Sequence, residues 1–196
     1  MNIVNILKKA AIITGSVFAI SSASAALEVS GINVDESTKI GNTELKLNGA
    51  GIRYKGFFKV YVAAIYAGDK KTSTEEVLAL PGPKRVVLTM LREVNADTMS
   101  QGLIDGINNN TSNDEKLKFF NQMLEIGKIF GSVRKLKEKD TITVDWNGHA
   151  TLVQINNKPV NVDLPEQAFY NSILKIWLGE RPADPTLKRA LLGGKQ

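Results

Sequence analysis

The sequence predicts an α+β fold in which helices cover one face of a large, mainly antiparallel sheet. The prediction rests on the order of the elements, since strands come first and a short helix, a strand, two helices, further strands and a last helix follow. No βαβ unit repeats along the chain, which disfavours a parallel sheet. With 196 residues, 43% of them hydrophobic, the chain is long enough for one domain with a hydrophobic core.

The first 25 residues are predicted to be a secretory signal peptide. Lys8 and Lys9 precede an apolar run over residues 10–20, and residues 23–25, Ala-Ser-Ala, have the small side chains of a cleavage site. The apolar run is shorter than the roughly 20 residues that span a bilayer, which argues against a membrane anchor. We therefore expect an exported protein, periplasmic in a bacterium, in which residues 26–196 form a single domain with no integral membrane segment.

Composition argues against several function classes. Loss of Lys8 and Lys9 would lower the formal charge from +5 to +3, and no basic stripe is interleaved with aromatic residues, so we expect no nucleic-acid partner. The chain has no cysteine, which excludes disulfides, zinc–thiolate sites and thiol catalysis. Its one histidine, His149, lacks metal-ligand spacing, so we expect no metal and no cofactor. The oligomeric state is not indicated.

Alternation of apolar and polar residues predicts the strands. The first two are expected over residues 27–35 and 43–47, with a polar turn at 36–42 between them. Residues 48–68 predict a β-hairpin that turns at Gly56 and has a second arm of β-branched, aromatic and small residues. Further strands are predicted at residues 84–91, 140–145, 150–155 and near Val160.

Capping residues and apolar spacing predict the helices. The clearest helix spans residues 113–130, with an apolar face formed by Leu117, Phe120, Met123, Leu124 and Ile126. The other helices are predicted over residues 73–80, 95–107, 165–178 and 184–192.

The hairpin contains the candidate site, because Arg53 and Tyr61 bring polar groups into apolar surroundings. If residues 54–56 form a three-residue loop, both side chains share one face, about 13 Å apart along the strand. A two-residue turn would put them on opposite faces. Alternatively, Arg53 pairs with an acid on a neighbouring strand and Tyr61 is a core aromatic residue. Arg92 is a candidate second cation at the cleft mouth, or an ordinary surface partner of Glu93.

Three segments resemble the chalcone isomerase superfamily, and most of all its bacterial, exported, chalcone isomerase-like branch. They are the Gly-Ile-Arg element within residues 48–53, the strand at 59–66 that begins with Lys and ends with Tyr, and the ending at 178–188. The resemblance covers about residues 27–192. It implies an open-faced β-sandwich, in which a ligand cleft lies between a large antiparallel sheet and a layer of helices.

The resemblance implies two different uses for the site. In catalytic members, an arginine that matches Arg53 stabilises the oxyanion during intramolecular cyclisation of a chalcone, and hydroxyl side chains position the substrate. Here Tyr61 stands where a strand threonine is expected, residues 94–103 contain no tyrosine, and Ile176 or a neighbour replaces another threonine. Noncatalytic members bind a fatty-acid carboxylate with an arginine and a tyrosine, which Arg53 and Tyr61 match more closely.

We therefore expect a noncatalytic protein that binds a small, apolar, anionic ligand such as a fatty acid. Arg53 would hold the anion and Tyr61 would assist, since a guanidinium matches the planar geometry of a carboxylate and an apolar cleft accepts an alkyl chain. One alternative is an intramolecular lyase of chalcone isomerase type, in which Arg53 is the catalytic residue. A second is a structural or partner-binding envelope protein whose own side chains fill the cleft.

Overall fold

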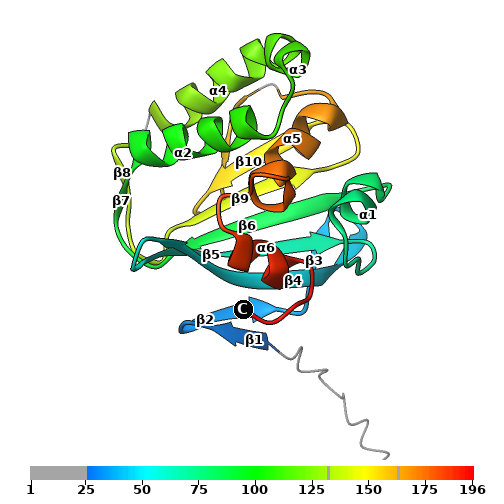
Figure 1. Ribbon diagram of the computed structural model, residues 1–196, viewed down its shortest axis with the longest axis vertical. Coiled ribbons are helices and arrows are strands. Elements are labelled where there is room, and N and C mark those ends of the chain that lie inside the picture. The colour runs from blue at the N-terminus through cyan, green and yellow to red at the C-terminus, as the bar shows by residue number, and fades with distance from the viewer. Residues whose placement is uncertain (1–25, 132, 163) are drawn as a thin grey trace, which may run out of the picture.

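The computed structural model describes residues 26–131, 133–162 and 164–196 (Figure 1). The predicted signal peptide, residues 1–25, lies outside the described residues. Within these ranges no helix has the length and apolar character needed to cross a bilayer.

A seven-stranded antiparallel sheet forms the centre of the molecule, and every neighbouring pair of strands in it is antiparallel. This confirms the predicted α+β class and the mainly antiparallel sheet. From one edge to the other the strands are β11 (Lys158–Val160), β10 (Thr151–Ile155), β9 (Thr141–Trp146), β6 (Lys84–Met90), β5 (Phe58–Ala67), β4 (Thr43–Lys55) and β3 (Ser37–Ile40).

Strand β5 is buried on both faces, as its continuous apolar sequence predicts. Alternate residues enter two separate clusters, because successive side chains of a strand point to opposite sides. Tyr61, Ala63 and Ile65 belong to the larger cluster beneath the helices, whereas Val62 and Tyr66 belong to the smaller cluster on the other face. The strand thereby ties the two layers of core together.

The smaller cluster is covered by a separate hairpin of β1 (Ala26–Val29) and β2 (Ile32–Asp35), seen below the sheet in Figure 1. The prediction of one strand over residues 27–35 is therefore wrong. Ser30 and Gly31 turn the chain with positive φ angles of 52° and 79°, and such a two-residue turn can lie inside an uninterrupted alternating pattern. The predicted polar turn at residues 36–42 likewise contains β3.

The helices lie on the opposite side of the sheet, where α2, α4 and α5 form a layer (Figure 1). Every region predicted to be helical is helical, with bounds that differ by a few residues. The helix predicted over residues 113–130 is broken into two. The helices are α1 (Thr74–Ala79), α2 (Ala96–Asn109), α3 (Asn113–Lys118), α4 (Phe120–Gly131), α5 (Gln167–Leu178) and α6 (Pro185–Leu191), and a short pair of strands, β7 (Val94–Asn95) and β8 (Lys135–Leu136), flanks α2.

The predicted helix over residues 113–130 is two helices, and its predicted apolar face is wrong in part. Leu117, Phe120 and Leu124 are 78%, 57% and 51% exposed. Helix α3 has no buried residue, and the buried side chains are Phe119, at the break between the helices, and four residues of α4. Phe119 packs edge-to-face on Phe169 of α5 with ring centroids 5.5 Å apart. The buried side of α4 is formed by Gln122, Ile126, Ile129 and Phe130.

Candidate ligand-binding site

Arg53 and Tyr61 lie directly opposite each other on β4 and β5, on the face of the sheet that the helices cover. Of the two turns that the sequence left open, the structure has the two-residue one, because Lys55 pairs with Phe58 and only Gly56 and Phe57 form the turn. A β-bulge at Val60 nevertheless places the Arg53 and Tyr61 side chains on the same face of the sheet. Tyr54 pairs with Lys59 and Arg53 pairs with Tyr61, so Val60 is an extra residue on β5. Gly56, with φ of 61°, supplies the left-handed conformation of the turn.

Two glycines on β4 allow helix α6 to lie against the strand beside Arg53. Gly49 and Gly51 share the helix-covered face with Arg53, because all three pair with residues two apart on β5. A Cβ atom at Gly49 would lie 2.2 Å from the backbone oxygen of Ala190, and one at Gly51 would lie 2.7 Å from the Cβ of Ala190. Only glycine permits this approach without moving α6. Two of the three segments that carry the family resemblance, residues 48–53 and 178–188, therefore meet here, since a Cβ atom at Gly51 would also lie 3.1 Å from Leu187 Cδ1.

The N-cap of α6 brings a carboxylate next to the Arg53 guanidinium. Asp184 Oδ1 accepts hydrogen bonds from the backbone N–H groups of Thr186 and Leu187, and Oδ2 accepts one from the N–H of Tyr54 at 3.0 Å. Arg53 Nη1 lies 3.8 Å from Oδ2, which is longer than the 2.7–2.9 Å typical of charge-assisted hydrogen bonds. The acid is thus engaged mainly by backbone groups, and it neutralises Arg53 without saturating it.

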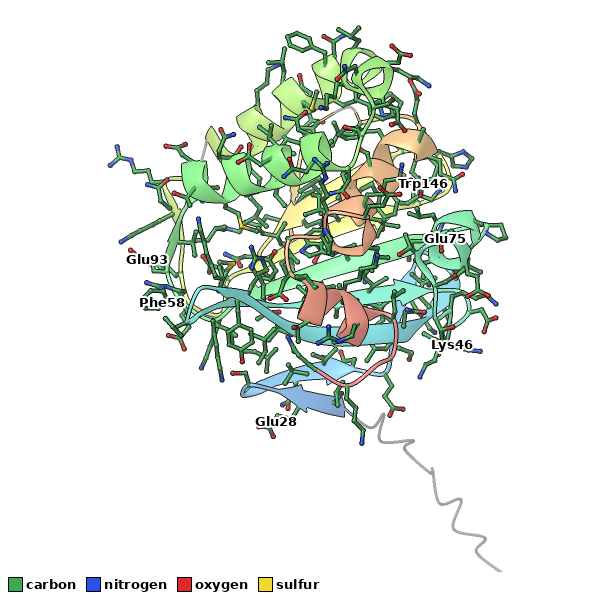
Figure 2. All side chains as sticks on the ribbon, in the orientation of Figure 1. Glu28, Lys46, Phe58, Glu75, Glu93 and Trp146 are labelled. Atoms are coloured by element: carbon green, nitrogen blue, oxygen red, sulfur yellow. The ribbon has the colours of Figure 1, made fainter. Side chains whose placement is uncertain are left out.

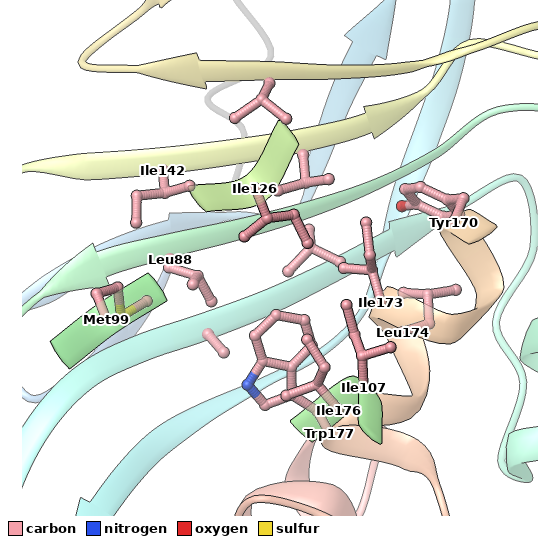
Figure 3. Packing of buried hydrophobic residues seen from close by; sticks show 14 of the residues in the cluster. Leu88, Met99, Ile107, Ile126, Ile142, Tyr170, Ile173, Leu174, Ile176 and Trp177 are labelled. Carbon is pink, nitrogen blue, oxygen red and sulfur yellow. The ribbon is translucent and has the colours of Figure 1, made fainter. Parts of the chain in front are cut away.

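The Tyr61 phenol is oriented by Trp177 of α5. Trp177 Nε1 donates a hydrogen bond of 2.9 Å to the phenol oxygen, and both residues are buried. Figure 3 shows the indole in the same apolar layer as Leu88 of β6 and Ile176 of α5. Burial raises the pKa of Tyr61, and the Trp177 hydrogen bond and the nearby Arg53 guanidinium oppose that rise. The phenol therefore stays protonated at neutral pH, and its own O–H is a potential donor to a ligand.

A cavity of about 130 Å³ lies beside Arg53 and Tyr61, between the β4–β5 hairpin and α2. Its polar wall is formed by Arg53, Lys55 and Tyr61 together with Thr98 of α2, and most of the remaining wall is apolar. The Arg53 side chain is 21% exposed, so its charge is partly shielded from water but still accessible. A partly buried cation beside an apolar cavity is a suitable site for an anionic head group with an apolar tail.

A second cavity, of about 30 Å³, adjoins the first. Leu103 of α2 and Ile176 of α5 line both cavities, so they form the boundary between them. The second cavity is lined by apolar side chains from the sheet and the helices, among them Leu88, Ile142 and Trp177. An apolar chain that enters at Arg53 would reach this space once Leu103 and Ile176 moved aside.

The sequence predicts Arg53 and Tyr61 as candidate site residues, and the structure brings them together, but the sequence does not predict the residues that surround them. Asp184 carries a detectable signal, because Asp before Pro185 is typical of a helix start, yet nothing in the sequence places it beside Arg53. Trp177 lies in the predicted helix over residues 165–178, but nothing in the sequence places it beside Tyr61. Arg92 does not pair with Glu93, since its guanidinium lies over the Phe58 ring and Glu93 pairs with Lys135. No group of three potential metal ligands occurs in the described residues.

The arrangement of an antiparallel sheet, a helix layer on one face and a cavity between them defines an open-faced β-sandwich. The sequence matches the chalcone isomerase-like family over residues 26–193, and the chain belongs to that family. A crystal structure of a fatty-acid binding protein from Arabidopsis thaliana has a similar fold, with a TM-score of 0.61 and 19% sequence identity. The similarity covers 83% of this chain and 92% of the plant protein. No curated protein matched the sequence.

Proposed function

We propose that this protein binds a small, apolar, anionic ligand such as a fatty acid, without catalysing a reaction. The observation that carries the proposal is the incompletely paired Arg53 guanidinium, which lies 3.8 Å from Asp184 and borders a partly open cavity. Arg53 would pair with the carboxylate, and Tyr61 would donate its O–H to a carboxylate oxygen while it accepts from Trp177. The fold shared with a plant fatty-acid binding protein supports this class of ligand.

The cavity volume limits the length of ligand that fits without rearrangement. A cavity of about 150 Å³ holds one benzene molecule, so the 130 Å³ beside Arg53 suits a chain of only a few carbons. Longer acids would have to displace Leu103 and Ile176 and extend into the second cavity. We therefore propose that short acyl chains bind without rearrangement and that longer chains bind by opening this boundary.

The composition of α2 favours a binding protein over an intramolecular lyase. The part of α2 that lines the cavity contributes Thr98, Met99, Gly102 and Leu103, of which only Thr98 has a hydroxyl group. An oxyanion formed during cyclisation would find Arg53, but fewer groups would hold the substrate in a reactive geometry. An absorbance assay with chalcone tests this alternative, and a rate above that of buffer would favour the lyase.

Export to the periplasm is a further part of the proposal, supported by the basic start, the apolar run and the small residues that precede Leu27. The intact mass of protein recovered from the periplasm tests it. Cleavage near Ala25 is the expected result, whereas an uncleaved chain in the cytoplasm would contradict it.

Paired ligands with the same tail test the anion site most directly. Calorimetric titration with a fatty acid and with the fatty alcohol of the same length should show tighter binding of the acid to the wild-type protein. Arg53→Gln should weaken acid binding by about tenfold to a hundredfold, because a hydrogen bond to a charged group contributes about 1.5–3 kcal/mol. Binding of the alcohol should change little. Arg189→Gln, which changes an exposed arginine of α6, is the matched control.

Three results would contradict the proposal. The first is that no acid of any length binds, and the second is that acid and alcohol bind the wild-type protein equally. The third is that Arg53→Gln and Arg189→Gln have the same effect on acid binding. Native mass spectrometry of the purified protein gives an independent check, since a bound acyl ligand would be lost from Arg53→Gln and retained in Arg189→Gln.

A further inference from the structure

The end of the β4–β5 hairpin exposes two adjacent aromatic rings. We call residues 55–59 the hairpin tip. The side chain of Phe57 is fully exposed, and Phe58 is 63% exposed. Phe57 follows Gly56 in the turn, and the tip lies at the margin of the molecule where Figure 2 labels Phe58. Isolated exposed apolar residues are common, but two neighbouring phenylalanines on a protruding turn expose a large apolar area to water.

Basic side chains surround these rings. Lys55 and Lys59 flank the turn, and the Arg92 guanidinium lies 4.7 Å from the centre of the Phe58 ring, within the range of a cation–π interaction. Glu93, the acid beside Arg92, is paired with Lys135 at 3.0 Å. Lys59 Nζ donates a hydrogen bond to the Ser30 hydroxyl, which is a neutral group and carries no compensating negative charge. The surface around the aromatic rings is therefore positively charged.

The hairpin tip also borders the entrance to the candidate site. Lys55 and Val60 line the cavity that contains Arg53. The same two residues line an adjoining surface hollow together with Phe58 and Arg92. A surface that contacts the tip would thus lie next to the opening through which a ligand reaches Arg53.

We propose that the hairpin tip docks on a lipid bilayer that contains anionic phospholipids. Aromatic rings are favoured at the interfacial region of a bilayer, and lysine and arginine side chains next to them are attracted to anionic head groups. The tip is a narrow turn with a basic rim, which suits insertion between head groups better than packing on a flat protein surface. This inference goes beyond the proposed function and holds whatever ligand the cavity binds.

Vesicle binding tests the proposal. Co-sedimentation of the purified protein should be strong with vesicles of phosphatidylcholine and phosphatidylglycerol, weak with phosphatidylcholine alone, and reduced by added salt. Replacement of both tip rings, Phe57→Ser with Phe58→Ser, should weaken binding by about tenfold or more, because the buried apolar area is lost. Lys59→Gln and Arg92→Gln should each weaken it by about fivefold.

A matched control removes an equally exposed ring elsewhere. Phe120 of α4 is 57% exposed, close to the 63% of Phe58. Phe120→Ser should therefore bind vesicles like the wild-type protein. Equal losses in Phe120→Ser and in the double tip variant would overturn the proposal, because they would show nonspecific adsorption. Absence of wild-type binding to anionic vesicles would also overturn it.

A substitution that keeps an aromatic ring at the hairpin tip, Phe57→Trp, gives a fluorescence readout of docking. The natural tryptophans, Trp146 and Trp177, are both buried, so Phe57→Trp adds the only exposed indole among the described residues. Its emission should shift to the blue with anionic vesicles and be quenched by spin-labelled lipids. An unchanged spectrum would overturn the proposal. So would sedimentation velocity data that show a tip-dependent dimer together with no vesicle binding, because the rings would then contact a second copy of the chain.

Discussion

Replacement of Asp184 by asparagine should weaken the fold and strengthen binding of an anionic ligand. The carboxylate caps α6, accepts from the Tyr54 N–H and lies 3.8 Å from Arg53. Asparagine retains one oxygen for the helix cap but presents an amide group where Oδ2 accepted from Tyr54. The same change removes the negative charge that competes with a ligand carboxylate for Arg53. The two effects have opposite signs, so they can be measured separately.

The size of each effect follows from these contacts. Loss of the Tyr54 hydrogen bond should cost about 1 kcal/mol, and loss of a negative charge at the helix N-terminus should cost about 0.3–1 kcal/mol more. Together they should lower Tm by about 3–8 °C, since 1 kcal/mol corresponds to about 2–4 °C in a domain of this size. A partly exposed ion pair contributes at most about 1 kcal/mol. Acid binding should therefore tighten by about fivefold.

The assay combines thermal unfolding of the free protein with calorimetric titration of a fatty acid and its alcohol. Asp184→Asn should bind the acid more tightly and the alcohol unchanged. Asp69→Asn is the control, because Asp69 is an exposed acid that pairs with Lys71, and it should alter neither measurement. Weaker acid binding by Asp184→Asn would refute the reasoning, because it would mean that Asp184 orients Arg53 and does not compete with the ligand.

Three further substitutions test the construction of the site. Tyr61→Phe should lower the free energy of unfolding by about 1–3 kcal/mol, because the buried Trp177 N–H loses its acceptor, and should weaken acid binding in the same titration. Gly49→Ala should destabilise the protein by about 1–3 kcal/mol in urea unfolding, since its Cβ would overlap backbone atoms of α6, whereas Gly68→Ala meets no atom and should not. Leu103→Ala should increase affinity for longer acids relative to shorter ones, because it opens the boundary between the two cavities.

The positions of the longer strands were predictable, because most of them have an alternating or continuous apolar pattern. The same pattern left open whether Arg53 and Tyr61 share a face, because that depends on the turn between them. A three-residue loop and a two-residue turn with a bulge at Val60 both place the two side chains on one face, and the structure has the second arrangement. A bulge adds one residue without any change in composition, so the sequence does not distinguish them. The short turn at Ser30 and Gly31 was not predicted either, because it lies inside an alternating pattern that it does not interrupt.

The surroundings of the pair were not predictable, because they come from distant parts of the chain. Trp177 lies 116 residues from Tyr61, and Asp184 lies 130 residues from the Tyr54 N–H that it binds. Local patterns identify a helix core position and a helix cap at these residues, but they carry no information on which strand each one meets. The register of α6 on β4 depends on close contact at Gly49 and Gly51, which only coordinates reveal.

A comparison of two arginines shows why Arg53 is the candidate ligand-binding cation. Arg85 of β6 pairs with Tyr66, on the sheet face away from the helix layer. It donates to both carboxylate oxygens of Asp145, at 2.7 and 2.6 Å, and to the Thr38 hydroxyl at 2.6 Å. A bidentate pair of this kind satisfies the guanidinium within the fold. Arg53 has instead a 3.8 Å contact with an acid that is engaged by backbone N–H groups, and it borders a cavity. Loss of Arg85 should therefore affect mainly stability, whereas loss of Arg53 should affect mainly binding.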